Sequence, residues 1–153
     1  MNNPVNDTTN FDPLKLEHQL CFRLYSASRK MTRAYQPILD KHGLTYPQYI
    51  LLMIMWEHES IDFKELSKLI DLKTATLTPI VQKLVALGYA TKEKNPEDGR
   101  RINVGLTDAG KNLKEEVKHV PMDVANCVDL EHERYLALIT ELDYLMDKFS
   151  KNE

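Results

Sequence analysis

The chain has 153 residues, of which 42% are hydrophobic, and a formal net charge of -3. This length suffices for one ordinary hydrophobic core, so we expect a single domain over residues 13–153 behind a flexible N-terminal tail of residues 1–12. No window approaches the roughly 18 apolar residues of a membrane span, and the N-terminus lacks the basic end and apolar run of a signal peptide. We therefore expect a cytoplasmic protein that does not contact membranes.

Two cysteines, Cys21 and Cys127, are too few for the disulfide framework of a secreted protein. Because the cytosol is reducing, a bridge between them would be regulatory rather than structural. The five histidines are not spaced as zinc ligands, either with each other or with the cysteines. The sequence therefore predicts no metal site and no cofactor.

The first two helices are predicted from apolar spacing. Apolar residues at helical intervals predict a long helix over about residues 13–41, ended by the sequence KHG. A second helix begins after Thr45, a suitable N-cap, with Pro47 in its first turn. It is apolar nearly all round, so we expect it to be the most buried helix.

Two shorter helices follow at 62–70 and 74–88, and Gly88 supplies the C-terminal stop of the second. Pro79 lies awkwardly inside that second helix, which favours a start nearer Thr76. Two short helices joined by a tight link are the helix-turn-helix pattern.

The apolar period then changes from 3.6 to 2. Segments 89–94 and 102–107 flank the charged sequence NPEDGRR, as a two-stranded hairpin requires. Thr107 or Asp108 can cap a further helix, which Pro121 interrupts.

The expected fold is mainly α with a small β-hairpin. A winged helix-turn-helix over 45–110 lies between long terminal helices at 13–42 and 122–150. The apolar faces of these terminal helices are too large for the small unit to cover, so we expect them to pair in a two-fold homodimer. Such a dimer would read two half-sites of a pseudo-palindromic operator, about one helical turn apart.

Charge is distributed unevenly along the chain. Residues 73–101 carry six basic and three acidic side chains, whereas the segment from Met122 to the end carries eight acids and three bases. The basic region can face phosphate. Its helix leaves polar side chains outside for base edges, and arginines at the wing tip can enter a minor groove or clamp a phosphate. The predicted DNA-binding residues are Lys73, Thr74, Thr76, Thr78, Gln82, Lys83, Arg100 and Arg101.

Asp98 would repel DNA unless it orients one wing arginine through a charge-assisted hydrogen bond, which is the role we assign to it. Taken alone, a charged hairpin tip can be merely solvated, and each threonine can serve only the start of its helix. The helix pair and the hairpin together favour double-stranded DNA as the partner.

Several segments resemble the MarR family, and in particular its organic-hydroperoxide-sensing branch, the OhrR repressors. They are LCFRLYSASRKMTRAY, LTYPQYILLMIMWE, LTP before a helix, and EDGRR before INVGLT. The resemblance covers about residues 14–120 and implies one MarR-type domain. It also implies that Cys21 is the peroxide-reactive thiol, hydrogen-bonded by Tyr35 and Tyr46, although a helix cysteine flanked by leucines is ordinarily a small buried hydrophobe.

Helix geometry limits how Tyr35 could hydrogen-bond Cys21. Tyr35 follows Cys21 by fourteen residues, about 21 Å along a straight helix, which a tyrosine cannot span. If the two touch, Tyr35 comes from the other subunit. A phenol hydrogen bond favours the thiolate, the form that attacks peroxide. In the alternative reading, Tyr35 and Tyr46 are interface packing residues.

The resemblance extends to Cys127, which matches the second thiol of the two-cysteine type. That type resolves the oxidised first cysteine by a disulfide between subunits, whereas one-cysteine relatives use a small cellular thiol. Cys127 can also be incidental, and a bond needs Cα atoms within about 7 Å.

The chain departs from the branch before the LTP motif. Lys73 and Thr74 stand where an acidic residue and a serine are expected, and Ala75 replaces a glycine. These changes remove a favourable N-terminal charge and add a possible phosphate contact, which affects operator preference rather than fold.

The leading hypothesis is a dimeric repressor that leaves operator DNA when an organic hydroperoxide oxidises Cys21, with Cys127 as the resolving thiol. The alternative is a MarR-type repressor relieved by a small phenolic ligand, with both cysteines incidental. A thiol peroxidase is disfavoured because the chain has no CxxC pair, thioredoxin-like alternation or cofactor loop. We therefore predict no enzyme and no catalytic residues. A pure interaction module would leave the wing arginines without a purpose.

Overall fold

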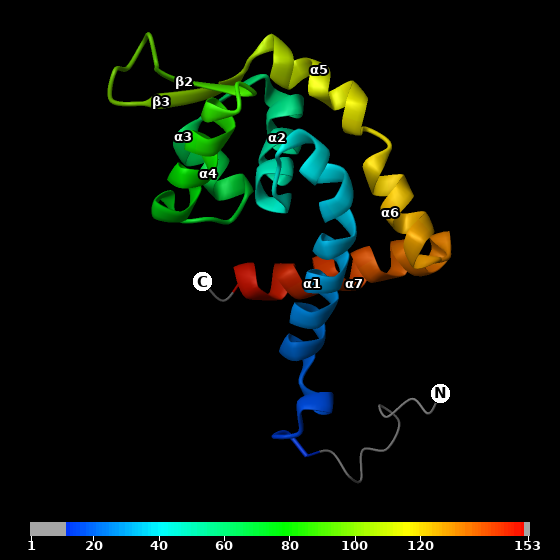
Figure 1. Cartoon of the computed structure of the whole chain (residues 1–153). Coiled ribbons are helices and arrows are strands. Elements are labelled where there is room, and N and C mark those ends of the chain that lie inside the picture. Colours follow the sequence, from blue (N-terminus) through cyan, green and yellow to red (C-terminus); the bar gives the residue numbers. More distant parts are fainter. Residues whose placement is uncertain (1–11, 152–153) are drawn as a thin grey trace. The chain divides into compact units, whose positions relative to one another are not determined.

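The computed structural model describes residues 12–151 and comprises two compact units, residues 1–114 and 115–153 (Figure 1). The expected tail of residues 1–12 therefore lies, apart from Asp12, outside the described residues. The first unit contains short 3-10 turns at Leu16–His18 and Asp40–His42 together with the elements α1 Leu20–Leu39, α2 Tyr46–His58, β1 Ser60–Asp62, α3 Phe63–Leu69, α4 Thr74–Ala86, β2 Ala90–Lys94 and β3 Ile102–Leu106. Helix α5 (Asp108–Val117) runs across the boundary, and the second unit holds α6 (Val120–Val128) and α7 (His132–Ser150). The prediction of a mainly helical chain with a small sheet is confirmed.

The first long helix starts later than predicted. Helix α1 begins at Leu20, because Gln19 has an extended backbone that separates it from the preceding 3-10 turn. Polar side chains bind backbone groups just before the helix. The Asp12 carboxylate accepts the Leu14 N–H at 2.9 Å, and the Gln19 amide donates to the Pro13 carbonyl. Such local bonds replace helical ones. At the other end, Gly43 has φ 68°, the left-handed conformation that ends a helix.

Helix α2 is the most buried helix, as expected. Thr45 is its N-cap residue, and the Thr45 N–H donates to the Gln48 side-chain oxygen at 2.8 Å. The helix places Tyr49, Leu51, Leu52 and Met55 in the core of the first unit. These buried side chains fix α2 against the elements around it.

Helix α4 begins at Thr74, so the later start favoured by Pro79 is wrong. Pro79 lacks the N–H that would bond to the residue four positions back. Beside it, the Thr78 hydroxyl donates to the Thr74 carbonyl at 2.8 Å, so that carbonyl has a further donor. Leu77, Val81 and Leu84 form the buried stripe of the helix.

The sheet has three strands in the order β1-β3-β2, all antiparallel, rather than the two that were predicted. Val104 is paired with Ile61 on one side and with Lys92 on the other, and its side chain is 0% exposed. Strand β1 has only three residues, too few to show an alternating pattern in the sequence. The additional strand ties the wing to the start of α3.

The base of the wing packs tightly against α2 and α5. The Trp56 indole N–H donates to the Gly110 carbonyl at 2.8 Å, and the Thr107 hydroxyl accepts the Gly110 N–H at 3.0 Å. A Cβ on Gly110 would lie 2.0 Å from the Tyr89 carbonyl oxygen. Thr107 rather than Asp108 thus caps α5, and glycine is required at position 110.

In the second unit, α6 buries Val120 and Val124, whereas α7 leaves its apolar side chains largely on the surface. Pro121 lies in the first turn of α6, where a missing N–H has no consequence. No residue of α7 is buried within the described chain, and its exposed apolar residues include Leu136, Ile139, Leu142 and Met146. Between residues 12 and 151, no helix is long and apolar enough to cross a membrane.

Gly110→Ala is expected to lower the free energy of unfolding by about 3 kcal/mol, because the new methyl group meets backbone that cannot rotate away. Urea unfolding monitored by circular dichroism measures the change. Gly99→Ala is the matched control, since nothing lies within 4 Å of its added Cβ. Equal midpoints for both variants would contradict the close approach at Gly110.

Candidate DNA-binding surface and thiol site

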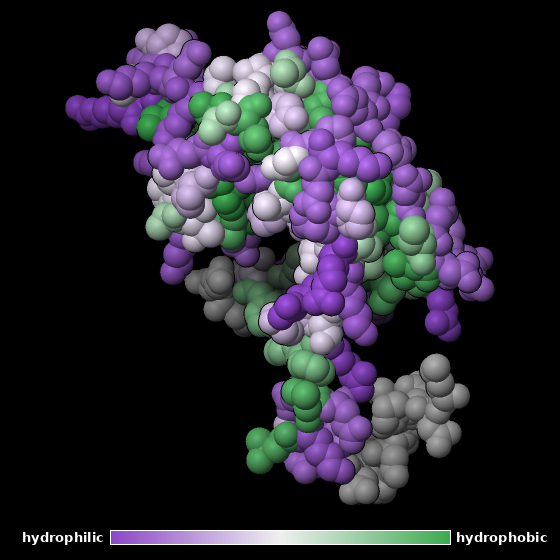
Figure 2. Space-filling model, viewed as in Figure 1, coloured by the Kyte–Doolittle hydropathy of each residue, from purple (hydrophilic) through white to green (hydrophobic). Residues whose placement is uncertain are grey.

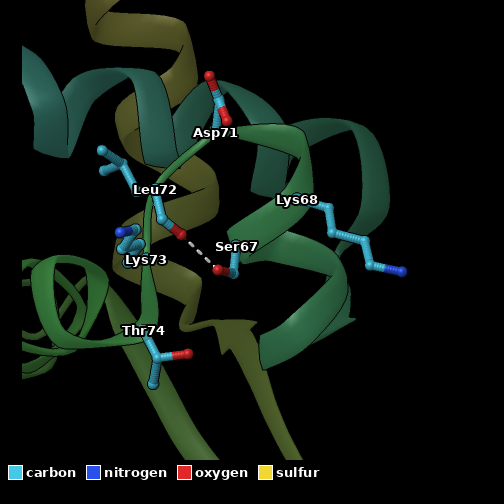
Figure 3. Close-up of a pocket in the computed structure, with 6 residues that line it drawn as sticks. All are labelled: Ser67, Lys68, Asp71, Leu72, Lys73 and Thr74. Atoms are coloured by element: carbon cyan, nitrogen blue, oxygen red, sulfur yellow. Dashed lines mark hydrogen bonds between the residues drawn. The ribbon is translucent and has the colours of Figure 1, made fainter. Parts of the chain in front are cut away.

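Helix α4 presents most of its predicted DNA-binding residues to solvent. Lys73 and Thr74 follow the turn from α3, in which Asp71 has φ 53° and the Ser67 hydroxyl donates to the Leu72 carbonyl (Figure 3). Along the helix, Thr76, Gln82 and Lys83 are exposed, and Thr78 is half-buried. This half-burial and its bond to the Thr74 carbonyl make the Thr78 hydroxyl less available than the others.

Asp62 connects α3 to the wing. One oxygen accepts the backbone N–H groups of Lys64 and Glu65 at 3.0 and 3.4 Å, which makes Asp62 the N-cap of α3. The other oxygen accepts the Arg101 Nε–H at 3.0 Å. Burial raises the pKa of Asp62, but the hydrogen bonds and the Arg101 charge outweigh this effect, so the pKa falls below its usual 3.8. Asp62 is therefore charged at neutral pH and holds Arg101.

The orienting role predicted for Asp98 is wrong. Its carboxylate accepts the backbone N–H of Arg100 at 3.0 Å, and its carbonyl accepts the Arg101 N–H at 2.9 Å. Asp98 therefore stabilises the turn and does not orient a guanidinium group. Asn95 supports the same turn through the Glu97 N–H. Asp62 orients the arginine because β1 pairs with β3 and brings position 62 beside the wing. Because the sequence pattern does not predict β1, it does not predict the contact between Asp62 and Arg101 either.

Basic side chains gather where α3, α4 and the wing meet. A cavity of about 200 Å³ lies there, and Figure 2 shows that the projecting wing at the upper left is largely hydrophilic. The residues that line the cavity include Thr74, Thr78, Lys92, Arg100 and Arg101. Lys92 was not among the predicted DNA-binding residues, because an isolated lysine in a strand carries no distinctive pattern.

Both cysteines are free and exposed. Cys21 lies in the first turn of α1, in the first unit, and Cys127 lies on α6, in the second. Tyr35 lies on the same α1 helix, about 21 Å from Cys21 along its axis. The structure thus does not bring Tyr35 to the thiol of its own chain.

Tyr35 and Tyr46 instead form an aromatic cluster. Their ring centroids are 5.0 Å apart, and Tyr49 lies 5.9 Å from Tyr35 and 6.4 Å from Tyr46. Trp56 extends the cluster, with its ring 6.2 Å from that of Tyr49. Burial raises the pKa of Tyr46, so its phenol stays protonated and can donate at neutral pH. The three- and seven-residue spacing of Tyr46, Tyr49 and Trp56 on one helix could have revealed the cluster.

A helix-turn-helix followed by a wing, with basic and hydroxyl side chains on both, defines a winged-helix DNA-binding protein. The model of the transcriptional regulators SarA/Rot matches residues 33–117. The chain belongs to the MarR family of transcriptional regulators.

Three known proteins or structures illustrate this membership. The organic hydroperoxide resistance transcriptional regulator of Bacillus subtilis (strain 168) is 43% identical over 111 residues, which are 72% of this chain and 76% of that protein. Reduced AbfR bound to DNA matches with a TM-score of 0.74 at 29% identity, over 88% of this chain and 94% of AbfR. AbfR comes from Staphylococcus epidermidis. Its disulfide form matches with a TM-score of 0.64 at 28% identity, over 89% of this chain and 92% of AbfR. The relatives are regulators rather than enzymes.

Asp62→Asn is expected to weaken specific DNA binding roughly tenfold at pH 7, because asparagine keeps the helix cap but releases Arg101. Fluorescence anisotropy with DNA from upstream of the gene measures the loss. Non-specific binding should not fall, since the variant removes a negative charge.

The same variant tests the pKa of Asp62. A carboxylate with a lowered pKa stabilises the fold fully above pH 3.8, and this contribution disappears as the pH falls through the folded-state value. The stability difference between wild type and Asp62→Asn should therefore be constant above about pH 4, shrink below it, and vanish once the pH lies below the folded-state pKa of Asp62. A difference that persists in acid would show that the carboxylate charge is not its source.

Proposed function

We propose that this protein is a dimeric repressor that leaves its operator when an organic hydroperoxide oxidises Cys21. The observation that carries the proposal is the combination of an exposed thiol at one end of α1 with the packed phenols of Tyr35 and Tyr46 at the other end. The proposal also draws on the 43% identity to the organic hydroperoxide regulator of Bacillus subtilis.

Two chains provide the contact that one chain cannot make. If two α1 helices pack antiparallel about a two-fold axis, Cys21 of each chain faces Tyr35 and Tyr46 of the other. The apolar side chains exposed on α7 and on the N-terminal part of α1 support this pairing, since a second copy would bury them. The dimer would place one α4 helix in each half-site of a pseudo-palindromic operator.

The oxidation step needs only the thiolate and the peroxide. The Cys21 sulfur attacks one peroxide oxygen, the O–O bond breaks, and the leaving alkoxide takes a proton to become an alcohol. Sulfur is oxidised by two electrons to a sulfenic acid, and the peroxide is reduced. The phenols of Tyr35 and Tyr46 act as hydrogen-bond donors that favour the thiolate.

Cys127 is the resolving thiol in this proposal. Its sulfur displaces the sulfenic hydroxyl of Cys21 in the partner, which forms a disulfide between the subunits and releases water. AbfR, a structural relative, is known both reduced on DNA and in a disulfide form. Capping by a small cellular thiol is the alternative route.

The aromatic cluster links Tyr46, beside the proposed thiol site, to the wing that contacts DNA in this proposal. Tyr46 contacts Tyr49, Tyr49 contacts Trp56, and Trp56 binds Gly110 at the base of the wing. A displacement of Tyr46 on oxidation would therefore reach the wing through packed side chains.

DNA release by wild type on addition of cumene hydroperoxide, reversed by dithiothreitol, is the expected result in an anisotropy titration. Cys21→Ser should stay bound at every peroxide concentration that oxidises the wild-type thiol. Cys127→Ser should lose the disulfide-linked dimer on a non-reducing gel. Release of Cys21→Ser to the same extent as wild type would refute the sensor.

Tyr46→Phe should slow the oxidation of Cys21 by about tenfold or more, because the ring packing remains but the donor hydroxyl is lost. Stopped-flow measurement of free thiol gives the rate. Tyr25→Phe is the matched control, since its hydroxyl binds Arg29 of the same helix at 2.7 Å. Equal rates for the two variants would leave Tyr46 as a packing residue.

A second candidate, a repressor relieved by a small phenolic ligand, is favoured by one observation. A cavity of about 380 Å³ lies beside Tyr46, and Arg29 and Arg33 line it. Under this candidate, a phenolic acid such as salicylate would release both wild type and Cys21→Ser from DNA. Peroxide would release neither of these two proteins through oxidation of Cys21.

A further inference from the structure

The cavity between α4 and the wing has a composition unlike that of an ordinary surface hollow. Its volume is about 200 Å³, and its walls come from the start of α3, from α4 and from the β2-β3 hairpin. Four basic residues line it, together with two threonines and a single acid: Lys64, Lys92, Arg100, Arg101, Thr74, Thr78 and Asp62.

The single acid in the cavity is already neutralised. Asp62 is bonded to Arg101 at 3.0 Å, and its side chain is only 10% exposed. Within residues 12–151, neither Lys92 nor Arg100 forms an ion pair with a carboxylate. The residues that line the cavity thus carry a net positive charge.

Lys92 is held in position rather than freely extended. Its ammonium nitrogen lies 5.3 Å from the centroid of the Phe63 ring, and Phe63 is itself buried at the first residue of α3. A cation over an aromatic face is attracted by the ring, which limits the positions that the lysine samples. Strand β2 places Lys92 opposite Val104, on the face that packs toward the core.

The place of the cavity in the fold indicates what would fill it. With α4 in the major groove and the wing in the adjacent minor groove, the sugar–phosphate ridge that separates the two grooves must pass between them. The cavity lies between these two elements, because its lining residues come from both. Phosphate oxygens would meet a fixed ammonium group, a guanidinium group and the Thr74 hydroxyl.

We infer that this cavity seats one phosphate of the DNA backbone and that Lys92 is a phosphate-binding residue. The inference rests on the proposed placement of α4 and the wing on DNA. Each half-site of a dimeric complex would then contain one such seat, which fixes the distance between the helix in the major groove and the wing. Lys92 positions the protein and reads no base.

Lys92→Gln tests the inference through the salt dependence of DNA binding. Loss of one phosphate contact per half-site should make the slope of log K against log salt shallower by about 0.9 per contact, or about 1.8 for the dimer. Specific and scrambled duplexes should lose affinity by the same factor. Lys92→Arg should restore the slope, which a merely structural defect would not allow.

Lys151→Gln is the charge-matched control, because this lysine is paired with Asp147 at the end of α7 and its loss should leave the slope unchanged. An unchanged slope for Lys92→Gln would overturn the inference. So would a loss confined to the specific duplex, which would make Lys92 a base-reading residue. Failure of wild type to bind DNA at all would instead refute the proposed function.

Inorganic phosphate distinguishes a free anion from the DNA backbone. At equal ionic strength, phosphate should compete with DNA no better than chloride does if the seat fits a phosphodiester held by its flanking sugars. Three results together would show that the cavity binds free anions and that the inference is wrong. Phosphate would inhibit DNA binding by wild type strongly, Lys92→Gln would remove that inhibition, and Lys92→Gln would leave the salt slope unchanged.

Discussion

The length of α1 is the constraint on which the proposed sensor depends. The helix is continuous from Leu20 to Leu39, and it holds Cys21 and Tyr35 about 21 Å apart in each chain. Tyr46 packs on Tyr35, so both phenols lie at the far end from their own thiol. A thiol that needs these donors must take them from a second copy. In the proposed mechanism, sensing therefore requires dimerisation, and oxidation of Cys21 would act directly on the interface between the two subunits.

The winged helix depends on a comparable fixed contact, that between Asp62 and Arg101. Strand β1 brings Asp62 to the wing, and the same carboxylate caps α3, so a single side chain sets the start of the helix-turn-helix and the direction of the arginine. Phe63, the next residue, holds Lys92 in the neighbouring strand. The α3 start therefore positions basic groups that lie far away in the sequence, and the aromatic contacts from Tyr46 to Trp56 reach the base of the same wing.

Most helices could be predicted from the sequence because each has a distinct apolar period and a clear stop, such as Gly43 after α1 or Gly88 after α4. Strand β1 could not, since three residues show no period and its existence depends on pairing with β3. The partner of Arg101 could not be predicted for the same reason, because Asp98 is the nearest acid in the sequence, whereas Asp62 is 39 residues away. Lys92 was missed because its position depends on a long-range contact with Phe63.

Mixed dimers show directly whether the phenol that activates Cys21 comes from the partner subunit. One chain would carry Cys21→Ser and a first affinity tag, and the other would carry Tyr46→Phe and a second tag, so that tandem purification isolates the heterodimer. Its one remaining Cys21 lies on the chain whose own Tyr46 is replaced. If the partner supplies the phenol, this thiol should react with hydroperoxide at the wild-type rate, whereas the Tyr46→Phe homodimer reacts slowly. A heterodimer as slow as that homodimer would show that the phenol acts within its own chain and would contradict the account.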